Sequence, residues 1–129
     1  MDWQPLIDRA LECRARAHAP YSGFLVGAAI LTSDGSIHGG CNVENRVLGL
    51  TLCAERVALG AAVASGAGKP VAVAVVTDTQ PPAAPCGQCR DSLAEFNEDI
   101  PVMLVNLEGD RQEMRLGDLL PNPFHLPEK

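Results

Sequence analysis

Apolar positions along the chain follow two patterns, helical spacing and short continuous runs, and these predict the first elements. Residues 4–17 place apolar side chains at helical spacing with charged side chains opposite them, which predicts an amphipathic helix. The apolar run 24–31, the turn chemistry of 33–36 and a second run after it predict a hairpin of buried strands. We therefore expect the chain to begin with a helix and a hairpin.

The rest of the chain alternates helices with buried strands. Thr51 is a suitable N-cap for the next helix, and Ser65-Gly66 is a suitable end for it. We expect the later elements, a strand, a helix, a strand and a short last strand, at residues 71–77, 86–96, 101–107 and 111–115. This alternation predicts a sheet covered on both faces, with parallel pairing where a helix separates two strands.

Composition and charge narrow the classes of function. Of 129 residues, 47% are hydrophobic and 20% charged, as is typical of a folded chain, so we expect a single α/β domain over residues 1–129. The net charge of -6 and the scattered Lys and Arg residues argue against a nucleic-acid partner. No apolar run is long enough to span a bilayer and the amino terminus lacks a signal-peptide pattern, so we expect a cytoplasmic protein without a membrane partner.

Three cysteines stand at positions suited to hold a metal. Cys86 and Cys89 are three residues apart at the start of a predicted helix, where they share one face and the helix dipole favours the thiolate. This pair alone is also compatible with a redox pair or a structural zinc site. Cys53, at the start of the other helix, offers a third thiolate, and Glu55 follows it. Three protein ligands leave zinc one open position for water, whose pKa falls to about 7, so that Glu55 can serve as general base and acid.

These residues form a wider pattern. One ligand, one residue, a glutamate and a later Pro-Cys-x-x-Cys make the signature of the zinc nucleobase deaminases, here with three cysteines. The signature belongs to a series of motifs, Pro20–Phe24, Val26–Ala29, Asn42–Asn45, Cys53–Arg56 and Pro85–Arg90. Through these motifs the chain resembles the cytidine deaminase family over most of its length. The resemblance implies a three-layer α/β/α fold with a mixed five-stranded sheet, one Zn²⁺ per subunit, a homotetramer, and a free nucleoside as substrate in pyrimidine salvage.

The signature and the resemblance together imply a mechanism and a set of substrate contacts. Glu55 takes a proton from zinc-bound water and delivers it to N3 of the base, the activated water attacks C4, and Glu55 then protonates the amino group that leaves as ammonia. Cytidine or deoxycytidine becomes uridine or deoxyuridine. By the resemblance, Asn42 and Glu44 hydrogen-bond the ribose, Phe24 packs against the pyrimidine, and Ala54 contacts the substrate.

The negative charge expected at the metal site favours a nearby cationic side chain. Three thiolates on a divalent zinc ion leave a charge of minus one, which opposes ionisation of the bound water. A guanidinium group beside the sulfurs would offset this charge. Arg56, next to Glu55, and Arg90, next to Cys89, are the two candidates, and the resemblance favours Arg56.

Two segments depart from the family pattern. Leu48 stands where the family usually has a tyrosine, and Phe124 follows Leu-Leu-Pro after two further residues instead of directly. Phe124 remains a candidate for contact with the pocket of a neighbouring subunit. Because both segments belong to the pocket wall and its subunit contacts, a modified cytosine nucleoside or an antibiotic of the blasticidin S kind stays open as the substrate.

Hypotheses from other classes stand beside the deaminase. A structural zinc module would close the tetrahedron with Cys41 as its fourth ligand. A thiol-disulfide protein would use Cys86 and Cys89 without metal, and would leave the Cys53-x-Glu55 spacing unexplained. Deamination of RNA or DNA is disfavoured by the acidic balance of the chain.

Overall fold

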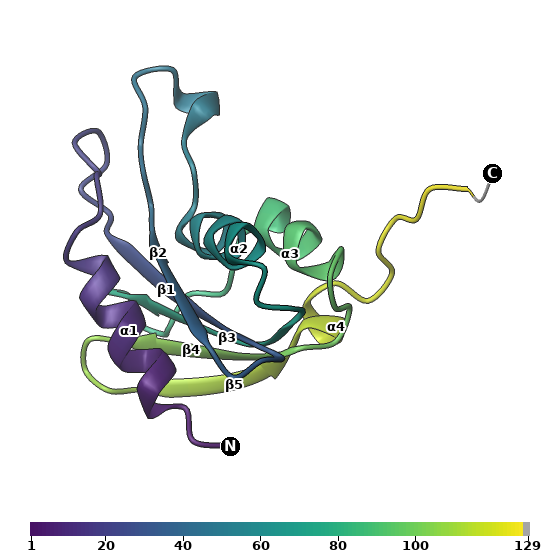
Figure 1. The fold of residues 1–129 in the computed structure, drawn as a ribbon. Helices are drawn as coiled ribbons and strands as arrows, with labels where there is room; N and C mark the ends of the chain where they lie inside the picture. Colours follow the sequence, from purple (N-terminus) through teal and green to yellow (C-terminus); the bar gives the residue numbers. More distant parts are fainter. Residues whose placement is uncertain (128–129) are drawn as a thin grey trace.

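The computed structural model describes residues 1–127 and is built on one five-stranded sheet (Figure 1). The strands, in sheet order, are β2 (Ile37–Cys41), β1 (Val26–Thr32), β3 (Pro70–Thr77), β4 (Pro101–Asn106) and β5 (Arg111–Arg115). The helices are α1 (Gln4–Arg14), α2 (Ala54–Ser65), α3 (Gly87–Ala94) and the short α4 (Leu116–Leu119), with a 3-10 turn, η1, at Leu48–Leu50. Within residues 1–127, the helices are too short or too polar to cross a bilayer.

Helices cover both faces of the sheet, which confirms the predicted three-layer α/β/α fold (Figure 1). On one face, the apolar side of α1 packs against Ala74 and Val76 of β3. On the other face, α2 and α3 pack against the alternate residues Val73 and Val75. Successive residues of a strand point to opposite faces, so β3 contributes to both cores. Burial on both sides explains why this strand is a continuous apolar run.

The sheet is mixed, and its pairing agrees with the prediction only in part. β1 and β2 form the expected antiparallel hairpin, and β3 and β4 are parallel, with α3 between them in the chain. The helix α2 also separates two strands of the same direction, β2 and β3, but the parallel pair expected there does not form. β1 lies between these two strands and pairs antiparallel with both. The carboxyl ends of β2 and β3 therefore lie at the same edge of the sheet.

The start of α2 differs from the prediction. The helix begins at Ala54 with Cys53 as its N-cap, and not with Thr51. Cys53 has an extended backbone (φ -75°, ψ 152°), and its carbonyl oxygen accepts the first hydrogen bonds of the helix. The predicted end is correct: Gly66 adopts the left-handed conformation, φ 72°, that closes the last turn.

Other limits also move by a few residues. α1 ends at Arg14, because the N–H groups of Arg16 and Ala17 bond to carbonyl oxygens three residues back instead of four. α3 ends at Ala94, before the predicted limit at residue 96. β2 is only half-buried, against the prediction of a buried strand, because it is an edge strand.

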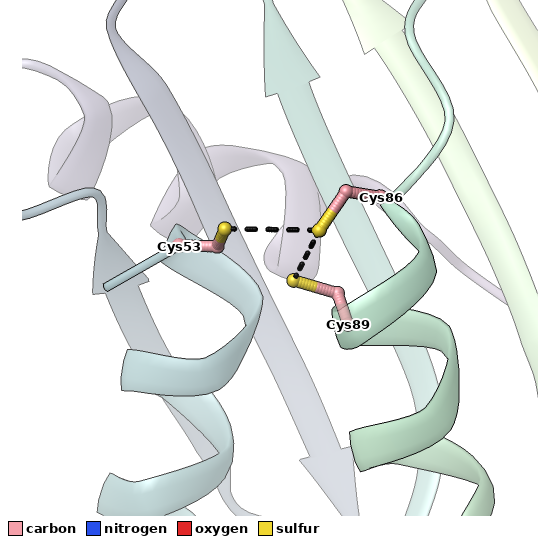
Figure 2. A group of neighbouring side chains, drawn as sticks. All are labelled: Cys53, Cys86 and Cys89. Atoms are coloured by element: carbon pink, nitrogen blue, oxygen red, sulfur yellow. Dashed lines mark hydrogen bonds between the residues drawn. The ribbon is translucent and has the colours of Figure 1, made fainter. Parts of the chain in front are cut away.

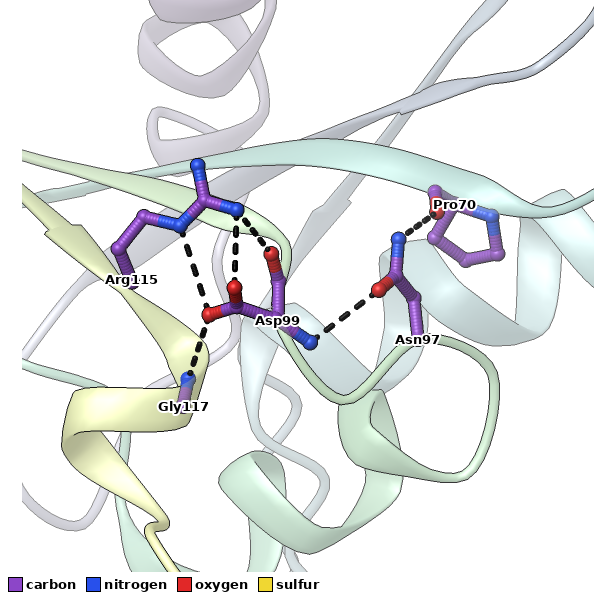
Figure 3. A network of polar contacts seen from close by, with 5 residues as sticks. All are labelled: Pro70, Asn97, Asp99, Arg115 and Gly117. Carbon is purple, nitrogen blue, oxygen red and sulfur yellow. Dashed lines mark hydrogen bonds and ion pairs between the residues drawn. The ribbon is translucent and has the colours of Figure 1, made fainter.

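A polar corner lies where β5 meets α4 (Figure 3). It is formed by Asn97, Asp99, Arg115, Gly117 and the Pro70 carbonyl group. The Asp99 carboxylate accepts hydrogen bonds from the Arg115 guanidinium at 3.0 Å and from the Gly117 backbone N–H at 3.3 Å. The Arg115 guanidinium lowers the pKa of Asp99. The Asp99 N–H donates to the Asn97 side chain at 3.2 Å, and the Asn97 amide donates to the Pro70 carbonyl oxygen at 3.3 Å. The corner thus joins the loop before β4 to the start of β3 and to α4.

The helix α2 lies very close to the sheet at Gly40 of β2. A Cβ atom at Gly40 would lie 2.4 Å from the backbone nitrogen of Ala58 and 2.5 Å from the carbonyl oxygen of Ala54. Backbone atoms of a packed helix cannot move aside as a flexible side chain can. The first turn of α2 can therefore lie this close to the sheet because Gly40 has no side chain.

We expect Gly40→Ala to lower the free energy of unfolding by about 1–3 kcal/mol, because the methyl group overpacks this contact. Gly60→Ala is the matched control, since open space surrounds Gly60 within the same helix. That change should be neutral or stabilising by up to about 1 kcal/mol, as expected of alanine in a helix. Urea unfolding of both variants measures the difference, and equal stabilities would contradict the proposed packing role.

Candidate active site and metal centre

Three thiol groups converge at the N-terminal ends of α2 and α3 (Figure 2). Cys53 is the N-cap of α2, Cys86 is the N-cap of α3, and Cys89 lies in the first turn of α3. The Cys86 sulfur lies 3.8 Å from the Cys53 sulfur and 3.5 Å from the Cys89 sulfur. All three sulfurs lie within 4.8 Å of one another. These are the cysteines that the sequence suggests as ligands.

The spacing of the sulfurs fits a tetrahedral zinc ion. Zinc–sulfur bonds of about 2.3 Å at tetrahedral angles place neighbouring sulfurs about 3.8 Å apart. Three sulfurs occupy three corners of the tetrahedron and leave the fourth to a water molecule or a substrate atom. The donor set is therefore that of a catalytic zinc site and not of a closed structural one.

The spare cysteine of β2 faces the other side of the sheet. A Cβ atom at Gly40 would meet α2, whereas one at Gly39 would meet the Cys13 sulfur on α1. Cys41 is two residues after Gly39 and so points to the α1 side. The group of possible metal ligands in residues 1–127 has three cysteines, and Cys41 is not among them. This geometry gives no support to a structural module with Cys41 as fourth ligand.

One of the two candidate guanidinium groups contacts the sulfurs. The Arg56 Nη2 atom lies 3.9 Å from the Cys53 sulfur. Burial raises the pKa of the Cys53 thiol, and the contact with Arg56 acts against this rise. Arg90 instead donates to the carbonyl oxygens of Pro85 at 2.8 Å and Leu119 at 2.9 Å. Arg56 therefore lies where it can offset thiolate charge, while Arg90 ties the start of α3 to α4.

The two thiols of α3 differ in their tendency to ionise. Burial raises the pKa of Cys89, and the charge of the nearby Glu55 carboxylate raises it further. Burial also opposes ionisation of Cys86, but hydrogen bonds from the Cys89 backbone N–H and from the neighbouring thiols outweigh it and lower the pKa of Cys86. Binding of a metal cation would stabilise the thiolate form of all the ligands.

The Glu55 carboxyl is buried beside the sulfurs. Glu55 lies in the first turn of α2 and is only 5% exposed. Burial raises the pKa of this carboxyl, against the opposing charge of Arg56. Glu55 lines a cavity of about 260 Å³ together with Cys53 and Cys86. A carboxyl group whose pKa is raised towards neutrality is suited to both accept and donate a proton there.

The same cavity gathers side chains from segments far apart in the chain. All four predicted substrate contacts line it, together with residues that were not predicted. The remaining lining residues are Phe24, Val26, Asn42, Glu44, Thr51, Ala54, Val75, Thr77, Ala83 and Ala84. Apolar walls with a few polar groups are typical of sites for small molecules.

Asn42 connects the end of the hairpin to the segment that carries Phe24. Its amide nitrogen donates to the Phe24 carbonyl oxygen at 2.7 Å, and its amide oxygen accepts from the Val26 N–H at 2.9 Å. Asn42 is 8% exposed, whereas Phe24 is 44% exposed. A buried amide thus holds the backbone beneath an accessible aromatic ring.

Glu44 is held from the same segment. Its Oε1 atom accepts from the backbone N–H groups of Tyr21 at 2.9 Å and Ser22 at 3.1 Å, and its Oε2 atom accepts from the Ser22 hydroxyl. These bonds, that of the Ser22 hydroxyl above all, lower the pKa of Glu44. Glu44 is therefore ionised at neutral pH.

The part of the cavity wall that follows β3 was not predicted from the sequence. Thr77 ends this strand, and Ala83 and Ala84 belong to the proline-rich loop after it. The buried Asn106 amide, at the end of the parallel strand β4, donates to the Thr79 carbonyl oxygen at 3.0 Å and so holds the loop. These residues belong to no recognisable sequence motif. They become neighbours of the site only in the folded chain, where they lie at the same edge of the sheet.

Two residues singled out in the sequence lie away from the cavity. Leu48 is part of η1 and is 70% exposed. Phe124, 78% exposed, lies in a separate groove beside α3. Neither side chain lines the cavity of its own chain. A contact between Phe124 and such a cavity therefore requires another copy of the chain.

Comparison with known proteins gives a match along most of the chain. The family model described as the cytidine and deoxycytidylate deaminase zinc-binding region matches residues 2–104. The cytidine deaminases of Sporosarcina psychrophila and Halalkalibacterium halodurans are 48% and 50% identical to the chain over 125 residues. These alignments cover 96% of this chain and 92% and 95% of the two relatives.

Solved structures share the fold. The crystal structure of cytidine deaminase from Burkholderia pseudomallei matches with a TM-score of 0.92 and 46% identity, over 96% of this chain and 100% of that chain. Cytidine deaminase from Mycobacterium tuberculosis matches with a TM-score of 0.84 and 41% identity, over 98% of this chain and 99% of that one. The chain therefore belongs to the cytidine deaminase family.

Proposed function

We propose that the chain is a zinc-dependent enzyme that hydrolyses free cytidine or deoxycytidine to uridine or deoxyuridine and ammonia. The observation that carries this proposal is the meeting, at one cavity, of three thiol groups at zinc spacing with the buried Glu55 carboxyl. Relatives at 48% and 50% identity bear the name cytidine deaminase, which supports the same class of substrate.

The zinc ion would be held by Cys53, Cys86 and Cys89, one ion per chain. When bound, it would supply a Lewis acid that lowers the pKa of a water ligand to about 7. The Arg56 guanidinium, through its contact with the Cys53 sulfur, would withdraw part of the negative charge of the three thiolates. This chemistry requires the open corner that three protein ligands leave.

We assign both proton transfers to Glu55. It accepts a proton from the attacking water and delivers it to N3 of the base as the bond from oxygen to C4 forms. It then moves a proton from the new hydroxyl group on C4 to the amino nitrogen, the bond from C4 to that nitrogen breaks, and ammonia leaves. Burial, which raises the pKa of Glu55, favours a carboxyl that gains and loses a proton twice in one turnover.

We assign nucleoside binding to Phe24, Asn42, Glu44 and Ala54, all of which line the cavity. Asn42 donates one amide hydrogen to the Phe24 carbonyl oxygen, and within residues 1–127 the other amide hydrogen has no partner, while the ionised Glu44 is an acceptor only. One donor and one acceptor suit a ribose hydroxyl. The accessible ring of Phe24 offers an apolar face to the pyrimidine.

A second candidate substrate is a modified cytosine nucleoside or an antibiotic of the blasticidin S kind. The observation that favours it is Leu48, which takes the place of the family's usual tyrosine in the segment after Glu44. Comparing the rates with cytidine and with blasticidin S in one assay decides between the two substrates.

We further propose that the enzyme is a homotetramer in which Phe124 reaches the pocket of a neighbouring subunit. Large apolar side chains lie exposed on the segments around the cavity mouth, which favours burial against another copy. They are Tyr21, Phe24, Val43, Val47, Leu48, Leu50 and Leu52. We also propose that it acts in the cytoplasm, because all five cysteines are free thiols, as in a reducing compartment. The proposed free nucleoside substrate would place it in pyrimidine salvage.

Zinc-loaded protein should convert cytidine to uridine, followed by the change in ultraviolet absorbance. Glu55→Gln should lose several orders of magnitude in kcat while keeping its zinc and its fold, because only the proton transfers are removed. Near-normal turnover by this variant would exclude Glu55 as the proton carrier. An unchanged chain that binds zinc and leaves cytidine intact would exclude cytidine as the substrate.

Replacing Cys53, Cys86 or Cys89 with Ala should lower the zinc content well below one ion per chain and reduce stability, because metal binding is coupled to folding. Cys41→Ser is the control, since Cys41 is not in the ligand group, and should keep both zinc and activity. Elemental analysis and thermal unfolding measure both effects. Loss of zinc from the Cys41 variant would instead support the structural module.

The apolar segment around η1 can be tested by changing Leu48 and Leu50 together to Asp, which should dissociate the tetramer and lower activity. Both side chains are more than half exposed in the single chain, so the fold should tolerate the change. Leu107→Asp, at an exposed turn after β4, is the control and should leave the assembly intact. Analytical ultracentrifugation gives the masses; a monomeric unchanged chain would rule out the tetramer.

A further inference from the structure

The Ser22 hydroxyl joins two walls of the cavity that come from different parts of the chain. It donates to the Oε2 atom of Glu44 and accepts the N–H of Phe24 at 3.0 Å. Gly23, between the two bonded residues, adopts the left-handed conformation with φ 69°, which turns the chain back towards the hydroxyl. Ser22 is thus bonded both to the acidic side chain and to the backbone of the aromatic wall.

These bonds belong to a closed circuit. Asn42 donates to the Phe24 carbonyl oxygen at 2.7 Å, Phe24 bonds to Ser22, and Ser22 bonds to Glu44, two residues after Asn42. The two polar residues assigned to the ribose and the backbone of Phe24, whose ring is assigned to the base, are therefore members of one hydrogen-bonded unit. The Ser22 hydroxyl closes the circuit at the Oε2 atom of Glu44, beside the two backbone N–H groups that bond to Oε1.

The hydrogen bonds to the Glu44 carboxylate show what the Ser22 hydroxyl contributes to its orientation. A carboxylate offers about four acceptor sites, and here Oε1 receives two backbone N–H groups while Oε2 receives the Ser22 hydroxyl. Among the described residues 1–127, one acceptor site on Oε2 stays free for a substrate hydroxyl, and its direction depends on the rotation of the carboxylate. Without the Ser22 bond, Oε2 would lose its only donor among residues 1–127, and the carboxylate would be held at one oxygen alone.

We infer that Ser22 is a positioning residue for nucleoside binding, whose hydroxyl orients the Glu44 carboxylate and fixes it relative to the Phe24 backbone. The inference rests on the proposed function and deepens it at the same site. The lowered pKa of Glu44, of which the Ser22 bond is the main cause, agrees with this role. Ser22 does not line the cavity itself, so it acts through Glu44 and Phe24.

The test uses the zinc-loaded enzyme with cytidine. Ser22→Ala should raise KM about tenfold, since a hydrogen bond to a charged group is lost, and should change kcat by no more than about twofold. Zinc content and the unfolding midpoint should stay as in the unchanged enzyme, which separates this role from a structural one. Ser22→Thr keeps a hydroxyl and should restore most of the affinity. Ser92→Ala removes an exposed hydroxyl that donates to the Gln88 carbonyl oxygen within α3, and should have no effect.

A double-mutant cycle shows whether Ser22 acts through Glu44. In a Glu44→Gln background, Ser22→Ala should change kcat/KM by less than about twofold, because the partner charge is already gone. Equal effects of Ser22→Ala in both backgrounds, or a KM unchanged by Ser22→Ala in an active enzyme, would overturn the inference and leave the proposed function standing. Inactivity of the unchanged enzyme towards cytidine would overturn both.

Discussion

The site depends on one constraint, that three sulfur atoms from two separate helices meet at a single point. β2 and β3 both run antiparallel to β1, so the loops that leave their carboxyl ends start from the same edge of the sheet. These loops lead into α2 and α3, which pack on the same face, and their N-terminal ends therefore converge. Gly40 allows α2 to approach the sheet closely enough for its first turn to reach this point. Helix N-termini also favour the thiolate that a metal needs.

Two carboxyl groups in one cavity are held in opposite electrostatic environments. Glu55 is buried beside the thiols, and burial raises its pKa, which suits a group that gains and loses protons. Glu44 receives hydrogen bonds from the segment before β1, and these lower its pKa, which suits a permanent acceptor. Arg56 contacts the Cys53 sulfur and limits the negative charge that gathers around Glu55. The environments, and not the residue type, therefore support the different roles that we propose for the two glutamates.

The sequence by itself determined the fold class, most element positions and the central chemical groups. Hydrophobic periodicity reports burial within each element, so the five strands and the three longer helices were placed to within a few residues of their observed ends, whereas the short helix α4 and the turn η1 were not predicted. Ligand spacing is also local: Cys86 and Cys89 are one helical turn apart, and Cys53 is two residues from Glu55. The geometry of each pair is set within the first turn of its own helix and does not depend on where that helix lies. Their combination was therefore sufficient to predict zinc chemistry.

Only the tertiary structure decided which distant residues become neighbours. Pairing of β3 with β1 instead of β2 depends on strand order, which no local pattern encodes. Packing decided that Arg56 contacts a sulfur while Arg90 bonds carbonyl oxygens, although each follows a functional residue in the sequence. The alanine and threonine residues of the cavity wall after β3 carry no chemical signature, and they matter because Asn106 holds their loop at the shared edge. Local spacing is set within one element, whereas these contacts arise only when separate elements pack against each other.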